Sequence, residues 1–216
     1  KKFASQESAN LNIRGGSENV LYSVSGSYQH QDDILKKGIH DYSNYSLRTN
    51  TDMNVTDNVK ISLDLNFKKD DRVSPMSGGV GRIYTQNPQY PVYWPGGYPS
   101  NPPSDYGYHP MINNTGGSGY YKDRGFYFTG KAGIDIKLPW IEGLGVDGYY
   151  AYNHYYNRGK DWNTPWTYYA WDDANKKVIP LGGGTVPNPT LEENFSHSHY
   201  NLYNFRVKYE RQFTDH

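Results

Sequence analysis

Adjacent carboxylates are the first groups in this sequence that could do chemistry. Asp70-Asp71 and Asp172-Asp173 are neighbours in the chain, whereas the two carboxylates of an acid–base pair must stand apart, across a substrate. Adjacent acidic residues are usually solvated. We therefore assign no catalytic residue to either pair.

A His-Ser-His sequence is the next candidate. His197 and His199 would lie on one face of an extended strand, where two imidazoles could bind a metal ion. No third ligand is evident nearby, and the chain has no cysteine. The sequence therefore predicts no metal site, no cofactor and no enzymatic activity.

Aromatic residues are concentrated in two segments that show no strand pattern. Flat rings there could stack on sugar faces or on apolar peptide side chains, which makes them candidates for substrate contact. Alternatively, such long loops fold on themselves and bury the rings. The candidates are Tyr90, Tyr93, Trp94, Tyr98 and Tyr106 in the first segment and Trp162, Trp166, Tyr168, Tyr169 and Trp171 in the second.

The composition predicts an all-β chain. Of the 216 residues, 16% are aromatic, and Tyr and Gly each occur 23 times. This aromatic content argues against disorder, although the mean hydropathy is −0.91. The 22 basic and 22 acidic residues balance, so nothing indicates a surface for nucleic acid.

Apolar and polar residues alternate in seven segments, as in strands with one apolar and one polar face. In the clearest segment Ile61, Leu63 and Leu65 alternate with Ser62 and Asp64. A tilted strand needs about 9 to 11 residues to cross the hydrocarbon of a membrane. Most of the segments are that long, and they lie at residues 9–15, 20–29, 44–55, 59–68, 126–138, 144–153 and 202–210.

The connections between these segments alternate between short and long. Short turns are expected at 16–18, 56–58 and 139–143, and long loops at about 32–41, 71–124 and 159–198. Outer-membrane barrels sort their connections in this way, with short periplasmic turns and long extracellular loops. We therefore expect an antiparallel transmembrane β-barrel fragment of about seven long strands, with residues 1–216 all in one barrel domain.

Two further sets of residues follow from this fold. Aromatic residues fall near the outer end of the apolar faces, where a girdle belongs: Tyr28, Tyr45, Phe67, Phe126, Phe128, Tyr156 and Tyr203. The polar faces would line the lumen, where charged residues are either simply solvated or hold a plug through ion pairs. The charged residues expected there include Arg48, Asp52, Asp64, Asp135, Asp147 and Arg206.

Several motifs carry a family resemblance. The segments are GGSENVLYSVSGSY at 15–28, QDDI at 31–34, NYSLRTN at 44–50, TDNVK at 56–60 and PWIEGL at 139–144. In order and spacing they resemble an early part of the barrel of SusC/RagA-type TonB-dependent transporters. Asp33 departs from the pattern, because the family usually has Gly there.

The resemblance implies more than the alternation does. By this resemblance, the chain is expected to belong to a barrel of about 22 strands around a plug, in the outer membrane of a Gram-negative bacterium. Such transporters are energised by the TonB complex and import oligosaccharides or peptides with a SusD-like surface lipoprotein as a lid, on which the loop aromatics could also pack. The plug, its TonB-contacting segment and the remaining strands are expected outside this chain.

Two other functions remain open. One is a passive porin or structural outer-membrane barrel. The other is a soluble glycan-binding β protein, in which the face of Ile61, Leu63, Leu65 and Phe67 would be a buried core. The expected function is a section of an active importer, without covalent chemistry.

Overall fold

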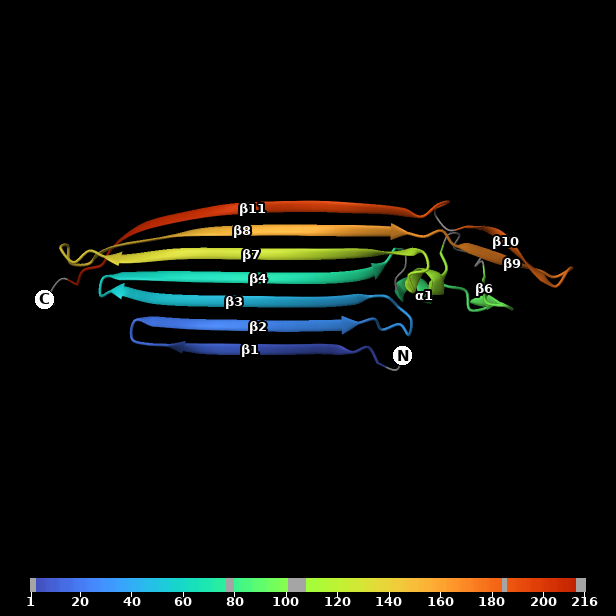
Figure 1. Ribbon diagram of the computed structural model, residues 1–216, viewed down its shortest axis with the longest axis horizontal. Helices are drawn as coiled ribbons and strands as arrows, with labels where there is room; N and C mark the ends of the chain where they lie inside the picture. Colours follow the sequence, from blue (N-terminus) through green and yellow to red (C-terminus); the bar gives the residue numbers. More distant parts are fainter. Residues whose placement is uncertain (1–2, 77–79, 101–107, 184–185, 213–216) are drawn as a thin grey trace.

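The chain forms one long antiparallel sheet. The computed structural model describes residues 3–76, 80–100, 108–183 and 186–212. Within these residues the main sheet has seven strands in the order β1-β2-β3-β4-β7-β8-β11 (Figure 1), which confirms the all-β antiparallel prediction. The strands are β1 (Gln6–Gly16), β2 (Val20–Asp32), β3 (Asp41–Thr56), β4 (Val59–Pro75), β7 (Gly119–Lys137), β8 (Leu144–Asn163) and β11 (Thr190–Tyr209).

The strands are long enough to cross a bilayer. They contain 11 to 20 residues, and a rise of about 3.3 Å per residue makes even the shortest about 36 Å long. The hydrocarbon core of a membrane is about 30 Å thick. Among the described residues, no helix has the length and apolar character needed to span a membrane.

Short and long connections lie at opposite ends of the sheet (Figure 1). The short ones are residues 17–19, 57–58 and 138–143, and the long ones are residues 33–40, 76–118 and 164–189. The second and third long loops carry small elements of their own. These are α1 (Val80–Tyr84), β5 (Tyr93–Trp94), β6 (Tyr98–Pro99), α2 (Pro110–Asn114), β9 (Thr167–Asp172) and β10 (Lys177–Gly183).

The strands extend further at the long-loop end than the alternation predicted. β4 continues to Pro75, β7 begins at Gly119, β8 ends at Asn163 and β11 begins at Thr190. In these extensions both faces carry charged or polar residues, so the hydropathy pattern stops while backbone pairing continues. The loops at 71–124 and 159–198 are therefore shorter than expected.

The register joins the predicted apolar residues of neighbouring strands into continuous rows. Leu47 lies opposite Phe67, and Phe67 lies opposite Phe128. We call this side of the sheet, which bears Leu63, the apolar face, and the side that bears Asp64 the polar face. Further rows of the apolar face are Met53–Ile61–Ile134, Ala132–Tyr150–Tyr203 and Ile136–Val146–Val207.

No second layer covers the apolar face in the described part of the chain. Ile61 and Leu63 are each 41% exposed, and Phe205 is 73% exposed. The apolar side chains that are buried in the described part of the structure are Tyr108, Ala151 and Trp166, two of which belong to the loops. Among residues 3–76, 80–100, 108–183 and 186–212, no buried core of the kind expected in a soluble β protein lies behind Ile61 and Leu63.

Candidate functional site

The two longest loops pack against each other through aromatic side chains. The Trp94 indole donates a hydrogen bond of 2.6 Å to the Tyr169 carbonyl, and the rings of Trp94 and Trp171 stack with centroids 6.0 Å apart. Tyr98 meets the edge of Tyr169 at 4.8 Å. The β5–β6 hairpin is thereby held beside β9 (Figure 1). We call this set of contacts the loop cluster.

A buried histidine, His109, adds ring contacts between the same two loops, and we include these contacts in the loop cluster. His109 is 1% exposed, with ring centroids 5.4 Å from Tyr93 and 6.1 Å from Trp166. Its Nδ1 accepts a hydrogen bond from the Ile112 amide at 3.2 Å and caps α2. Nε2 then carries the proton and donates to the Val92 carbonyl at 2.7 Å.

Burial lowers the pKa of the His109 imidazole, and the hydrogen bond to the Val92 carbonyl opposes this shift. The ring is therefore held in its neutral form. Around it, the buried amides Asn113 and Asn114 hydrogen-bond to Ser118 and Tyr108. This polar centre ties α2 to the start of β7.

The predicted substrate-contact residues divide into packed and exposed ones. Trp166 is 9% exposed, whereas Tyr90, Tyr93 and Tyr98 are 40% to 42% exposed. Trp94, Tyr168, Tyr169 and Trp171 are partly covered by their loop neighbours. Most of these rings are therefore covered at least in part by packing between the loops. Tyr90, Tyr93 and Tyr98 keep exposed ring surface that a ligand could contact.

One of the predicted loop residues lies in a strand, and another lies outside the described residues. Trp162 is in strand β8, opposite Tyr120 and Leu191, so placing it in a loop was wrong. The reason is that β8 continues past the end of its alternating segment. Tyr106 lies outside the described residues.

The predicted lumen residues share the polar face. Asp147 accepts two hydrogen bonds from Arg206, at 3.0 and 3.1 Å, and pairs with Lys208 at 2.5 Å. Lys208 also reaches Asp135 at 3.1 Å. These groups line a depression of about 630 Å³ together with Asp52, Asp64 and Lys131.

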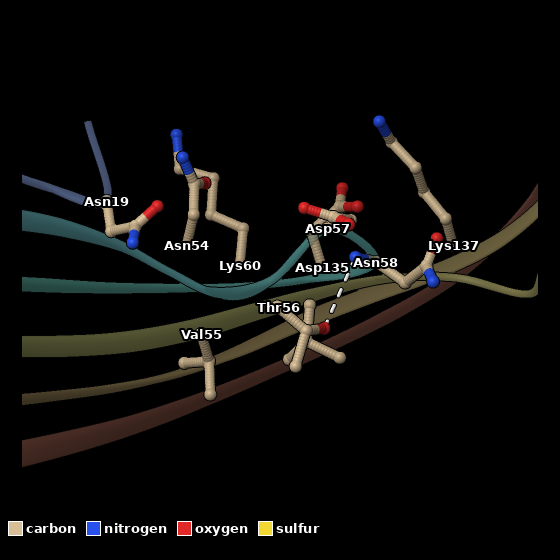
Figure 2. Close-up of a pocket in the computed structure, with 10 residues that line it drawn as sticks. Asn19, Asn54, Val55, Thr56, Asp57, Asn58, Lys60, Asp135 and Lys137 are labelled. Carbon is tan, nitrogen blue, oxygen red and sulfur yellow. Dashed lines mark hydrogen bonds between the residues drawn. The ribbon is translucent and has the colours of Figure 1, made fainter.

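The remaining members of this set continue the same face. Lys60 pairs with Asp52 at 3.0 Å, the Asn50 amide donates to Asp64, and Arg48 lies opposite Asn66. Figure 2 shows the separation of the faces at the β3–β4 turn, where Asn54, Lys60 and Lys137 point to one side of the sheet and Val55 to the other.

The carboxylate pairs are occupied by structural contacts. Asp70 pairs with Lys68 at 3.6 Å, and Asp71 pairs with Lys69 at 2.7 Å. Asp172 accepts hydrogen bonds from the amides of Ala174 and Asn175 and thereby shapes the β9–β10 turn. The side-chain and backbone hydrogen bonds from Asn175 lower the pKa of Asp172.

One group of potential metal ligands, not foreseen from the sequence, comes together in the described residues. It consists of His30, Asp32 and Asp41, with His30 Nε2 at 3.3 Å from Asp32 and 3.8 Å from Asp41. The other ring nitrogen meets the Ser43 hydroxyl at 3.0 Å. His197 and His199 lie instead on β11, opposite Tyr156 and His154.

Comparison with known proteins supports the fold. No family model matches the chain, and no curated protein gives a significant match. Among solved structures, the chain is similar to one described as the RagAB peptide importer in the "closed-closed" state, with a TM-score of 0.58 and 13% sequence identity. The likeness covers 96% of this chain and 30% of that chain. This chain therefore shares the fold of part of that larger chain.

Proposed function

We propose that this chain is a section of the barrel of an active outer-membrane importer that takes up oligosaccharides or peptides with energy from TonB. The observation that carries the proposal is the two-faced sheet. Rows of apolar side chains are exposed on one face, and a connected set of charged side chains covers the other. Lipid on one side and water on the other satisfy both faces at once.

The sheet edges support a larger barrel. Within the described residues, β1 and β11 each pair on one side only. Unpaired backbone groups are very costly in hydrocarbon, so further strands must complete the wall. The likeness to 30% of a peptide importer chain agrees with a barrel that continues beyond these seven strands.

The loop cluster is the proposed outer mouth of this barrel. The packed rings of His109 and Tyr169 hold the exposed Tyr93 and Tyr98 in place, ready to stack on a sugar or an apolar peptide side chain, and Tyr90 of the same loop is also exposed. A SusD-like surface lipoprotein would close over the same end of the sheet. The chain itself performs no covalent chemistry in this proposal.

Energised uptake is the test of the proposed function. Cells expressing the full-length protein in the outer membrane are offered labelled oligosaccharides and labelled peptides, with and without an uncoupler of the proton-motive force. We expect accumulation of one of these two cargo classes, abolished by the uncoupler. Entry that persists unchanged with the uncoupler would instead identify a passive porin.

The loop tyrosines provide a matched comparison in the same assay. Tyr93→Ala removes an exposed ring of the loop cluster, whereas Tyr84→Ala removes a ring of α1 that is 82% exposed and has no ring partner among the described residues. We expect Tyr93→Ala to lower uptake severalfold and Tyr84→Ala to leave it unchanged. Equal uptake by both variants would remove the loop cluster from the substrate path.

A further inference from the structure

Two pairs of like charges face each other across β7 and β8. Lys122 lies directly opposite Lys160, and Arg124 lies directly opposite Arg158. Side chains that are directly opposite in an antiparallel pair have Cβ atoms about 4.5–5.5 Å apart, and like charges there destabilise the sheet. Two such pairs in succession therefore need an explanation.

Neighbouring carboxylates neutralise only part of this charge. Asp71 pairs with Arg124 at 3.2 Å but also with Lys69 at 2.7 Å. Glu193 is engaged by Arg158 at 2.9 Å. Within the described part of the chain, Lys122 and Lys160 form no ion pair.

The four basic side chains surround a depression. It has a volume of about 190 Å³, and it is lined by Tyr120, Lys122, Arg124, Arg158, Lys160 and Glu193. We call it the basic cleft. Two arginines and two lysines around one depression present planar guanidinium groups and mobile ammonium groups to the same point, a combination suited to phosphate.

The position of the basic cleft along the strands identifies its environment. The cleft residues have the same strand parity as Phe126, Phe128 and Tyr156, so they lie on the apolar face. Phe126 and Tyr156 are in ring contact at 6.0 Å and belong to the proposed aromatic girdle. Arg158 lies two residues beyond Tyr156, which is about 7 Å further along the strand, away from the proposed hydrocarbon. Lys160 lies four residues beyond Tyr156, which is about 13 Å further in the same direction.

We infer that the basic cleft binds a phosphate group in the headgroup of an outer-leaflet lipid. The inference rests on the proposed function, because it requires the apolar face to be turned toward a bilayer. At this height the side chains reach the headgroup layer, and a phosphate between the two strands offsets the repulsion of Lys122 from Lys160 and of Arg124 from Arg158. Glu193 forms the acidic rim of the cleft and holds Arg158 in place.

The opposite side of the same strands argues for selectivity. Asp161 lies on the polar face at this height, opposite Glu192 of β11, and Asp123 lies on the same face of β7. The ends of β7 and β8 are thus basic toward the proposed lipid, with Lys122, Arg124, Arg158 and Lys160, and acidic toward the proposed lumen, with Asp123 and Asp161. Charge of this kind attracts anionic headgroups to the outside of the wall without drawing them into the mouth.

The test compares lipid binding by full-length protein purified in detergent. The variant is the double substitution Lys122→Gln and Lys160→Gln, and the control is Lys68→Gln with Lys131→Gln, two lysines of the polar face on neighbouring strands. The probes are phosphorylated lipid A, the same lipid with its phosphates removed, and inorganic phosphate. The readout is bound lipid, measured by native mass spectrometry and by the shift in unfolding temperature.

We expect phosphorylated lipid A to bind the wild-type and control proteins and to bind the cleft variant at least about tenfold more weakly. Equal binding by the cleft variant, equal binding of the dephosphorylated lipid, or the same stabilisation by inorganic phosphate alone would each overturn the inference.

A barrel assay on the same preparations separates the two proposals. A cleft variant that migrates as a folded barrel but binds phosphorylated lipid A as well as the wild type would contradict only lipid binding at the basic cleft. Wild-type protein that is not recovered from the outer membrane would contradict the proposed function, and therefore the inference as well.

Discussion

His109 is an enclosed titratable side chain of the loops, and its protonation couples loop stability to pH. Burial lowers the pKa of this imidazole in the folded loops, whereas the ring regains a value near 6.5 when the loops open. The open form therefore binds more protons below about pH 6.5. The contribution of His109 to loop stability is complete above that pH and is lost as the pH falls.

Limited proteolysis of the loops measures this effect. We expect cleavage within residues 80–118 to accelerate as the pH is lowered from about 7.5 to about 5.5, with the strands left intact. His109→Gln should remove the acceleration, and His197→Gln on β11 should retain it. Acceleration that persists in His109→Gln would assign the effect to another group.

Trp166 is a packing residue, whereas Tyr90 is available at the surface. Trp166 is 9% exposed, and its ring contacts His109 and Tyr168. Because a buried Trp→Ala change usually costs about 3–5 kcal/mol, Trp166→Ala should open the loop cluster and speed amide hydrogen exchange in both loops. Tyr90→Ala, at a residue 40% exposed, should leave exchange unchanged. Equal exchange in the two variants would refute the assigned roles.

The strands sort their side chains into two environments, and adjacent positions of β4 should respond in opposite ways. Leu63→Arg places a charge on the apolar face, where we expect a loss of about 2–4 kcal/mol and poor barrel assembly. Asp64→Asn, one residue further on the polar face, should be mild. Unfolding in denaturant and recovery from the outer membrane provide the measurement, and equal tolerance would contradict the two faces.

The β7–β8 turn depends on glycine at one position. Gly143 has φ of 85°, and a Cβ there would come within 2.0 Å of the Glu210 carbonyl oxygen. Gly143→Ala therefore forces the turn away from the end of β11, and we expect a loss of about 1–3 kcal/mol. At Gly145 the nearest atom would be 3.3 Å away, so Gly145→Ala should cost less in the same unfolding assay. A smaller loss at Gly143 would argue against this turn geometry.

Local alternation was enough to predict the strands inside the proposed membrane but not their ends. On β4 the pattern of Ile61, Leu63 and Leu65 is clear, and the observed pairing agrees with it. Beyond Phe67 the apolar face continues as Lys69 and Asp71, so hydropathy no longer marks a strand. The basic cleft was missed for this reason, since Lys122 and Lys160 both fell in expected loops.

Contacts between distant segments could not be predicted from one sequence. Trp94 and Tyr169 are 75 residues apart in the chain, and nothing local indicates that their loops meet. The start of α2, by contrast, could have been predicted from the local sequence. His109 precedes Pro110, and proline at the first helical position often marks a helix start. The grouping of His30 with Asp41 required the register of β2 and β3.

At the scale of the whole molecule, the seven strands form an open wall that needs neighbours. Its apolar rows are exposed, and β1 and β11 form its edges in the described residues. We expect the 216-residue chain expressed alone to aggregate or to require denaturant, while the full-length protein forms a heat-modifiable barrel in detergent. A soluble, monodisperse 216-residue chain would contradict this expectation.

The most direct test of the bilayer assignment uses the absence of cysteine in this chain. Single cysteines are placed along β4 in a full-length protein from which any other cysteine has been removed, with Ile61→Cys, Leu63→Cys and Leu65→Cys on one face and Ser62→Cys, Asp64→Cys and Asn66→Cys on the other. Each is treated in intact outer membranes with a membrane-impermeant thiol reagent and with a lipid-soluble one. We predict that residues 62, 64 and 66 react with the impermeant reagent and that residues 61, 63 and 65 react only with the lipid-soluble one. Uniform labelling by the impermeant reagent at all six positions would contradict the account.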